Sequence, residues 1–200
     1  MDGGLSPSAR IGPNAILQLV PVLDKAIGPR ARQGLFHEAG VALPPPDAGM
    51  LPEAEVTRLH GALDFWLPSL APVLLRQAGL ATGDYILANR IPPLAKTAIR
   101  LMPAPLGARV LAGAITRHAW TFAGSGAFAV EGFRPLTLAI RANPLATGKP
   151  HSPGCHWHTA VFERLFGQLV WPGAHVVETA CCAMGHPACR FRISRNVKLD

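Results

Sequence analysis

No apolar run in this sequence of 200 residues is long enough to cross a membrane. Proline, arginine, histidine or aspartate interrupts each candidate run before it reaches the ~18 residues that a spanning helix requires. The first residues, Met1-Asp2-Gly3-Gly4, also lack the basic start and the apolar core of a signal peptide. We therefore expect a cytoplasmic protein that has at most peripheral contact with a membrane.

Charged residues are scarce. They make up 16% of the chain, and 49% of the chain is apolar, whereas a charged share of ~25% is usual for soluble domains. The formal charge of +7 comes from scattered basic residues, without an aromatic-interleaved basic strip or the pattern of a recognition helix. The composition therefore argues against a nucleic-acid partner and favours an anionic small molecule or weak attachment to an acidic membrane face.

The motifs of common redox cofactors are also missing. No Gly-x-Gly-x-x-Gly follows a predicted strand, and the sequence has no P-loop and no cysteine run suited to an iron–sulfur cluster. A reductase needs a source of hydride such as a nicotinamide or a flavin. The sequence therefore offers no visible motif for holding such a source.

The first 125 residues carry mainly helical patterns, punctuated by glycine and proline. Pro52 suits the start of the clearest helix, in which Val56, Leu59, Leu63 and Trp66 recur at helical spacing. In chain order, the predicted helices span residues 15–20, 30–39, 53–67, 72–78, 85–90, 94–102 and 108–123. We expect the apolar face of the 53–67 helix to pack on the rest of the chain.

After Gly126 the pattern changes from helix to strand. Strands are predicted at residues 127–131, 136–141, 174–182 and 188–194, with one helix at residues 154–170. Ser152 and Pro153 suit the start of that helix. This order indicates an α+β fold, in which N-terminal helices pack on a four-stranded antiparallel sheet. We expect a mainly helical part, 1–125, and a β-β-α-β-β module, 126–200, to form one compact unit.

The four cysteines are concentrated in the last fifth of the chain, together with one carboxylate. In a reducing compartment such cysteines are more typical of metal ligands or buried thiols than of disulfides. Zinc takes four ligands from thiolate, imidazole and carboxylate groups. Cys155, Glu178, Cys181 and Cys189 would converge if the 154–170 helix lies across the last hairpin. The alternative is that the cysteines are buried as small apolar side chains.

The spacing of these residues raises a geometric objection. Glu178 and Cys181 would point to opposite faces of an ideal strand, so the strand must bulge or end near residues 179–181. Cys182 would share a face with Glu178, which keeps Cys182 as a substitute ligand. His158 and His186 are further candidates.

Cys155, then an aromatic helix, then Glu178-x-x-Cys181-x-x-x-Gly185-x-x-x-Cys189 resembles the 4-vinyl reductase domain family. This family occurs in bacteriochlorophyll-biosynthesis proteins and in the sensor domains of some aromatic-responsive bacterial regulators. The whole chain resembles the stand-alone biosynthetic member. The resemblance implies a structural zinc ion held by Cys155, Glu178, Cys181 and Cys189. It also implies a fold shared with vesicle-tethering and haem-based gas-sensing domains.

Aromatic residues cluster just upstream of this motif and in the aromatic helix. Core packing is their ordinary role, and the alternative is that some of them line an apolar cavity for a flat ligand. The candidate ligand-binding residues are His118, Trp120, Phe122, Phe128, Trp157 and Phe162. His118 is the candidate for ligating the magnesium of a tetrapyrrole, and Arg134 and Arg141 are candidates for porphyrin carboxylates. A histidine bonded to a carbonyl and solvated arginines are the ordinary alternatives.

Together with the resemblance, these residues predict an accessory protein of bacteriochlorophyll biosynthesis. It would bind a divinyl tetrapyrrole, a porphyrin or chlorophyllide intermediate, and present it to a biosynthetic enzyme such as magnesium chelatase. We assign no catalytic residue. One alternative is an 8-vinyl (4-vinyl) reductase of divinyl protochlorophyllide or chlorophyllide, and another is a small-aromatic sensor domain. A homodimer is compatible with each of these functions.

Overall fold

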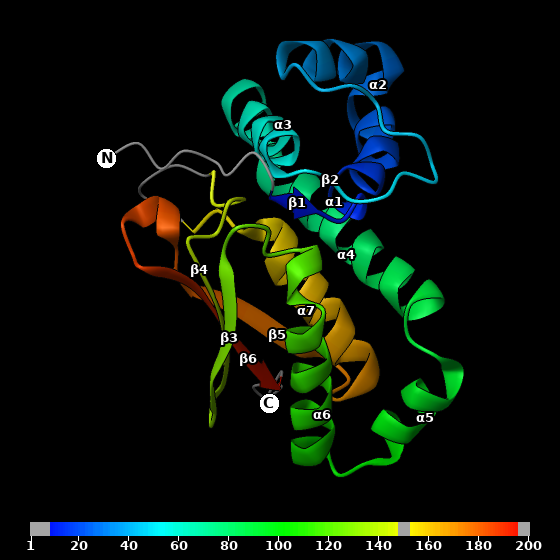
Figure 1. The fold of residues 1–200 in the computed structure, drawn as a ribbon, viewed down its shortest axis with the longest axis vertical. Helices are drawn as coiled ribbons and strands as arrows, with labels where there is room; N and C mark the ends of the chain where they lie inside the picture. The colour runs from blue at the N-terminus through cyan, green and yellow to red at the C-terminus, as the bar shows by residue number, and fades with distance from the viewer. Residues whose placement is uncertain (1–8, 148–152, 196–200) are drawn as a thin grey trace, which may run out of the picture.

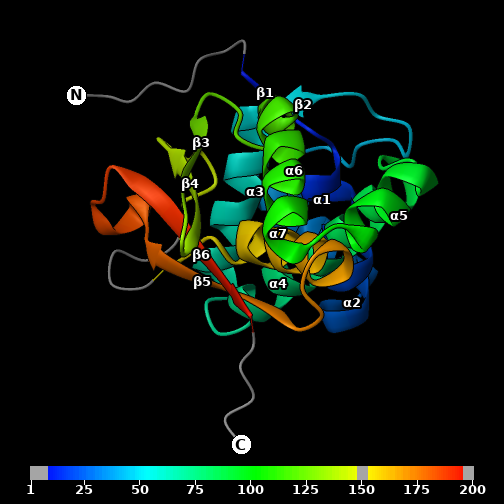
Figure 2. The ribbon, with the colours of Figure 1, turned by 90° about the horizontal axis from the view of Figure 1, so that it is seen from below.

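A four-stranded antiparallel sheet forms one layer of the protein, and helices cover one of its faces (Figures 1 and 2). The computed structural model describes residues 9–147 and 153–195. The helical elements are α1 (Asn14–Leu17), α2 (Leu19–Glu38), α3 (Glu53–Trp66), α4 (Ala71–Asn89), α5 (Pro93–Leu101), α6 (Ala104–Arg117), α7 (His156–Leu169) and two 3-10 turns, η1 (Ala119–Thr121) and η2 (Cys182–Met184). The strands are β1 (Arg10–Ile11), β2 (Leu51–Pro52), β3 (Ala127–Phe133), β4 (Leu136–Arg141), β5 (Ala174–Ala180) and β6 (Ala188–Arg195).

The sheet has the strand order β3-β4-β6-β5, with every neighbouring pair antiparallel. Its strands come from the two predicted hairpins, and α7 connects the hairpins in sequence. On β6, Cys189, Phe191 and Ile193 alternate with more exposed residues and are buried, as the period-2 pattern predicts. The α+β prediction, with helices packed on a four-stranded antiparallel sheet, is confirmed.

α7 is the helix that joins the sheet to the N-terminal helices. Its apolar stripe, predicted from helical spacing, is buried along its whole length. The buried apolar residues of α7 with large side chains are Trp157, Val161, Phe162, Leu165, Phe166 and Leu169. The helix begins at His156, with Cys155 at the N-cap, rather than at residue 154. The predicted cap Ser152 lies outside the described residues.

α4 corrects one prediction. The glycines and prolines of this region suggested two short helices, at residues 72–78 and 85–90, whereas the structure has a single helix from Ala71 to Asn89. Gly79 and Gly83 lie inside it, where α4 packs along α7. A Cβ at Gly79 would lie 2.8 Å from the Ala160 Cβ, and one at Gly83 would lie 2.6 Å from the Arg164 Cβ. These glycines permit a close helix contact and do not end the helix.

Two more helices differ from prediction at their ends. α6 begins at Ala104 instead of residue 108, because Pro105 falls in the first turn, where a proline costs no hydrogen bond. It ends at Arg117 and is followed by η1, whereas a single helix to residue 123 was predicted. In α3, Val56, Leu59 and Leu63 are buried as predicted. Trp66, at the end of α3, is 56% exposed, contrary to the expectation that this face packs throughout.

Among the described residues, none of the helices combines the length and the apolar content that spanning a bilayer requires.

The buried His60 makes the stability of the fold depend on pH. Its Nε2 donates to the Ala15 carbonyl oxygen at 3.1 Å, and burial lowers the pKa of His60 from 6.5 to about 4 despite that hydrogen bond. Below pH 6.5 the unfolded chain takes up a proton that the folded chain excludes until about pH 4, so stability is lost as the pH falls through this window. We expect the free energy of unfolding to include a loss of about 2 kcal/mol from His60 at about pH 5.

Urea unfolding at about pH 7.5 and at about pH 5 measures this loss. The matched variant is His60→Gln, which keeps an N–H donor for Ala15 but does not titrate. Its free energy of unfolding should differ less between the two pH values than that of the parent. An equal pH dependence in both proteins would show that His60 is not the group responsible.

Candidate metal centre

Four side chains from three elements meet at one end of the sheet. Cys155 caps the start of α7, Glu178 lies on β5, Cys181 directly follows β5, and Cys189 lies on β6. One ligand atom from each of these residues lies within 4.8 Å of the ligand atoms of the other three. The structure therefore brings together the four residues that the sequence singled out, in a cluster that could hold a metal ion.

A bulge in β5 makes this convergence possible. The register between β5 and β6 shifts between Glu178, which pairs with Phe191, and Ala180, which pairs with Arg190. The extra residue, Thr179, offsets the alternation of side chains, so Glu178 and Cys181 reach the same side of the sheet. The predicted bulge or strand end near residues 179–181 is confirmed in both forms, because β5 also ends at Ala180.

The three sulfur atoms have the separations expected of ligands that share one ion. The Cys155 Sγ lies 3.3 Å from the Cys189 Sγ and 4.0 Å from the Cys181 Sγ, and the last two are 3.9 Å apart. A tetrahedral zinc ion with Zn–S bonds of about 2.3 Å would separate its sulfur ligands by about 3.8 Å. The side chains therefore need only small movements to bind such an ion.

Glu178 supplies an oxygen that has no other visible use. Its Oε2 accepts a 2.9 Å hydrogen bond from the backbone N–H of Cys155. Its Oε1 is buried and has no hydrogen-bond partner within residues 9–147 and 153–195. A buried acceptor without a partner is costly, and a cation between the thiols would satisfy it. The donor set, three sulfurs and one carboxylate oxygen, therefore fits a zinc ion.

The electrostatics of the cluster favour the same conclusion. Burial raises the pKa of Glu178 from 4.5 to about 7. The Cys181 thiolate accepts hydrogen bonds from the thiols of Cys155 and Cys189, which lowers the pKa of Cys181 and raises that of Cys155. Without a cation, the cluster thus holds one thiolate and keeps its other groups largely protonated. A divalent ion would let the remaining protons leave, because it compensates the negative charge of the ligands.

Two N–H groups support the sulfur atoms from outside the cluster. The Asn143 side-chain amide donates to the Cys155 Sγ at 3.2 Å, and the backbone N–H of Cys182 donates to the Cys189 Sγ at 3.2 Å. Such bonds stabilise the thiolate form that binds metals. Sequence reasoning missed Asn143, because Asn143-Pro144 has the composition of an ordinary turn.

The three alternative ligands lie elsewhere. The Cys182 side chain is directed to the Ile140 carbonyl oxygen, at 3.9 Å. His186 is exposed in the turn between β5 and β6. His158 is buried on α7, and its Nε2 lies 3.3 Å from the Phe122 carbonyl oxygen. In the described structure none of them belongs to the cluster.

Four of the six predicted ligand-binding residues lie on or beside α7 and form a group of aromatic rings. The ring centres of Phe122 and Phe128 are 5.4 Å apart, and those of Phe122 and Phe162 are 5.8 Å apart. Trp157 joins this group through His158, whose ring centre is 5.0 Å away. The rings are in contact with one another, and they fill the space between α7 and the sheet.

His118 and Trp120 are not part of this group. His118 is exposed at the end of α6, where its Nδ1 lies 2.9 Å from the Ala114 carbonyl oxygen. Trp120 is 61% exposed. Arg134 and Arg141 are both exposed and lie at opposite ends of β4. The predicted helix through residue 123 would have kept His118 and Trp120 on α6, but α6 ends first.

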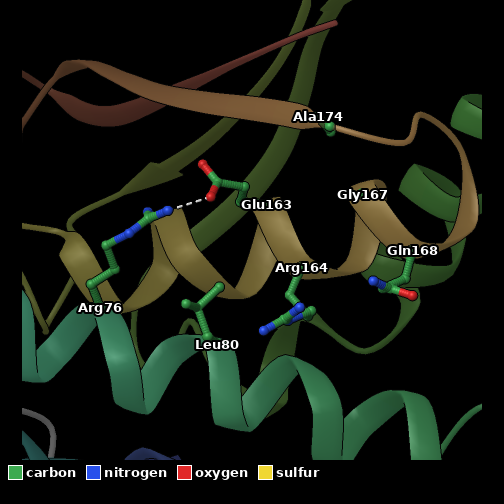
Figure 3. Close-up of a pocket in the computed structure, with 8 residues that line it drawn as sticks. Arg76, Leu80, Glu163, Arg164, Gly167, Gln168 and Ala174 are labelled. Carbon is green, nitrogen blue, oxygen red and sulfur yellow. Dashed lines mark hydrogen bonds and ion pairs between the residues drawn. The ribbon is translucent and has the colours of Figure 1, made fainter. Parts of the chain in front are cut away.

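A hollow of about 290 Å³ lies between α4, α7 and the start of β5 (Figure 3). An ion pair between Arg76 and Glu163 crosses it. Its lining residues are Arg76, Leu80, Glu163, Arg164, Gly167, Gln168, Gly173 and Ala174. They include none of the predicted ligand-binding residues, and the arginines and the glutamate make the hollow unsuitable for a wholly apolar ligand.

The fold resembles solved structures of H-NOX proteins. The chain matches the Fe(II) unliganded H-NOX protein from K. algicida with a TM-score of 0.61 and 14% identity, over 95% of this chain and 99% of that one. It matches the H-NOX protein from S. oneidensis, in the Fe(II)NO ligation state, with a TM-score of 0.54 and 12% identity, over 92% and 98% of the two chains. At these identities the likeness concerns the fold alone.

Sequence relatives are much closer. Residues 136–195, from β4 to β6, match the model of the 4-vinyl reductase domain. The chain is 60% identical to the "Bacteriochlorophyll synthase 23 kDa chain" of Cereibacter sphaeroides over 96% of this chain and 94% of that protein. It is 56% identical to the protein of the same name from Rhodobacter capsulatus over 91% and 85%. The chain therefore belongs to the 4-vinyl reductase domain family, together with these bacteriochlorophyll synthase 23 kDa chains.

Proposed function

We propose that the protein takes part in bacteriochlorophyll biosynthesis by binding a vinyl-bearing tetrapyrrole intermediate and presenting it to a biosynthetic enzyme. The observation that carries this proposal is the 60% identity, over nearly the full length of both chains, to a bacteriochlorophyll synthase 23 kDa chain. Identity at this level, without large gaps in coverage, supports a role in the same pathway. Magnesium chelatase is the partner enzyme that we would test first.

The metal in the cluster is, in this proposal, a structural zinc ion held by Cys155, Glu178, Cys181 and Cys189. An ion with four protein ligands has no open position for a substrate. Its chemical contribution would be to neutralise the buried thiolates and the carboxylate. The chain's own residues do the rest, since Cys155 holds the start of α7 against the end of the β5–β6 hairpin.

We place the tetrapyrrole in the aromatic group on α7. Two polar atoms there, the Trp157 Nε1 and the His158 Nδ1, are buried without a hydrogen-bond partner among the described residues. Buried polar atoms of this kind suit a ligand or a water molecule that completes their bonding. Phe122 and Phe128 are only half-buried, so a flat ligand would enter by moving these two rings apart.

A spectroscopic titration with a divinyl magnesium porphyrin tests the proposal. We expect saturable binding, with a shift of the porphyrin absorption band and quenching of tryptophan fluorescence. Phe122→Leu should weaken binding on the order of tenfold, because it removes one aromatic face. The matched control is Phe65→Leu, at a ring that is 74% exposed on α3, and it should bind as the parent does. Absence of binding in the parent would refute the proposal.

The same sample distinguishes a carrier from a reductase. Reduced nicotinamide is added after binding, and the monovinyl spectrum is sought. Binding without conversion agrees with a carrier, whereas conversion to the monovinyl product would replace the proposal by the vinyl reductase alternative.

A further inference from the structure

α5 presents leucines to solvent at the edge of the molecule. In both views it lies at the periphery, on the far side of the helices from the sheet (Figures 1 and 2). Leu94 is 85% exposed and Leu101 is 80% exposed. The two leucines and the exposed Ala98 between them are spaced at i, i+4 and i+7 and so share one face of the helix. Leu106, at the start of α6, is 49% exposed and extends the apolar surface.

The other side of α5 fixes the direction in which these leucines point. Ile99 is buried, and Gly107 of α6 packs so closely that a Cβ there would lie 3.2 Å from the Ile99 carbonyl oxygen. The Lys96 Nζ donates to the Leu87 carbonyl oxygen at 2.8 Å, and the Arg100 Nε donates to the Gln168 carbonyl oxygen at 3.1 Å. α5 is therefore anchored on three sides, and its leucines face away from the protein.

The charge around α5 is of one sign. Residues 85–130 carry five basic side chains and no acidic one, although the rest of the chain has nearly equal numbers of each. The five are Arg90, Lys96, Arg100, Arg109 and Arg117. Most of the excess positive charge of the protein thus lies in the segment that contains the exposed leucines.

An apolar helix face flanked by cations suits the interface of an anionic lipid bilayer, where leucines enter the acyl region and cations remain among the headgroups. A second copy of the chain is a poorer occupant, because two such surfaces would bring like charges together. The protein also carries an apolar surface without this charge pattern. Phe65, Trp66, Leu70 and Val73 are exposed near the α3–α4 connection, but no lysine or arginine occurs between residues 59 and 75.

We propose that α5 and the start of α6 dock the protein on a membrane surface that contains anionic lipids. Docking needs no spanning segment, because the helix lies in the plane of the interface. The proposal does not depend on tetrapyrrole binding, since the surface is formed by residues outside the aromatic group.

Sedimentation with lipid vesicles tests this docking surface. Vesicles of phosphatidylcholine alone are compared with vesicles that also contain phosphatidylglycerol, at low and at high salt. We expect binding only to the anionic vesicles, and release by salt, because screening weakens the attraction of exposed charges. Binding to neither kind of vesicle, or equal binding to both, would overturn the proposal.

Two matched double variants locate the surface. The pair Leu94→Glu and Leu101→Glu should lower partitioning into anionic vesicles by about tenfold or more, since it removes two inserted side chains and adds two negative charges. The control pair Phe65→Glu and Trp66→Glu should bind as the parent does. Because all four side chains are exposed, both variants should keep the parent's circular dichroism and melting temperature. The docking surface is wrongly assigned if the control pair loses binding or the leucine pair retains it.

Discussion

Cys189→Ser is expected to remove the metal from the protein and to lower its stability more than any other single change at the centre. Cys189 is fully buried, and its sulfur lies 3.3 Å from the Cys155 Sγ and accepts the N–H of Cys182. A serine hydroxyl is a much weaker zinc ligand than a thiolate. Because metal binding to such a site contributes to folding, we expect a loss of about 3 kcal/mol or more in the free energy of unfolding.

Elemental analysis and thermal unfolding measure this effect. The parent, purified without added metal, should contain about one equivalent of zinc, and Cys189→Ser should contain almost none. Cys182→Ser is the matched control, since it makes the same exchange at a cysteine that lies outside the cluster. Less than about half an equivalent of zinc in the parent, or equal metal loss in both variants, would contradict the assignment.

Gly79→Ala is expected to push α4 away from α7. The added Cβ would collide with the Trp157 carbonyl oxygen and lie 2.8 Å from the Ala160 Cβ. Both are parts of rigid helix, so neither can rotate away from the methyl group. Overpacking of this kind costs about 2–3 kcal/mol, which should lower the melting temperature by about 5–10 °C.

Gly113→Ala in α6 provides the comparison. Nothing lies within 4 Å of a Cβ built at Gly113, so alanine there should stabilise the protein by about 0.5–1 kcal/mol through its higher helix propensity. Thermal unfolding of the two variants should therefore give shifts of opposite sign. If Gly79→Ala also stabilised the protein, the close contact between α4 and α7 would be refuted.

The metal cluster was largely predictable from sequence because its ligands are chemically distinctive. Thiols and a carboxylate are rare elsewhere in this chain, and the family pattern fixed which of them to choose. Strand alternation alone would have paired Glu178 with Cys182. The bulge at Thr179 reverses that choice, and its position depends on how β5 pairs with β6. Asn143 could not be predicted, because only the folded chain brings its amide to the Cys155 sulfur.

The ligand-binding residues divide according to the element that carries them. Trp157 and Phe162 belong to a strongly periodic helix, so their burial in α7 followed from their spacing. His118 and Trp120 were assigned to a helical face that does not exist, because α6 ends at Arg117. Helix ends are set by a few local contacts, and apolar periodicity does not reveal them.

The order of helices and strands, the α+β class and the set of metal-binding residue types are properties of local sequence: they depend on spacing, on proline and glycine at element ends, and on side-chain chemistry. Long-range packing decided the rest. α4 continues through Gly79 and Gly83 because α7 needs the space that they leave, although these glycines suggested a break. The leucines of α5 are equally apolar in sequence whether buried or exposed. Only the anchoring of Ile99, Lys96 and Arg100 against neighbouring helices turns them to the solvent.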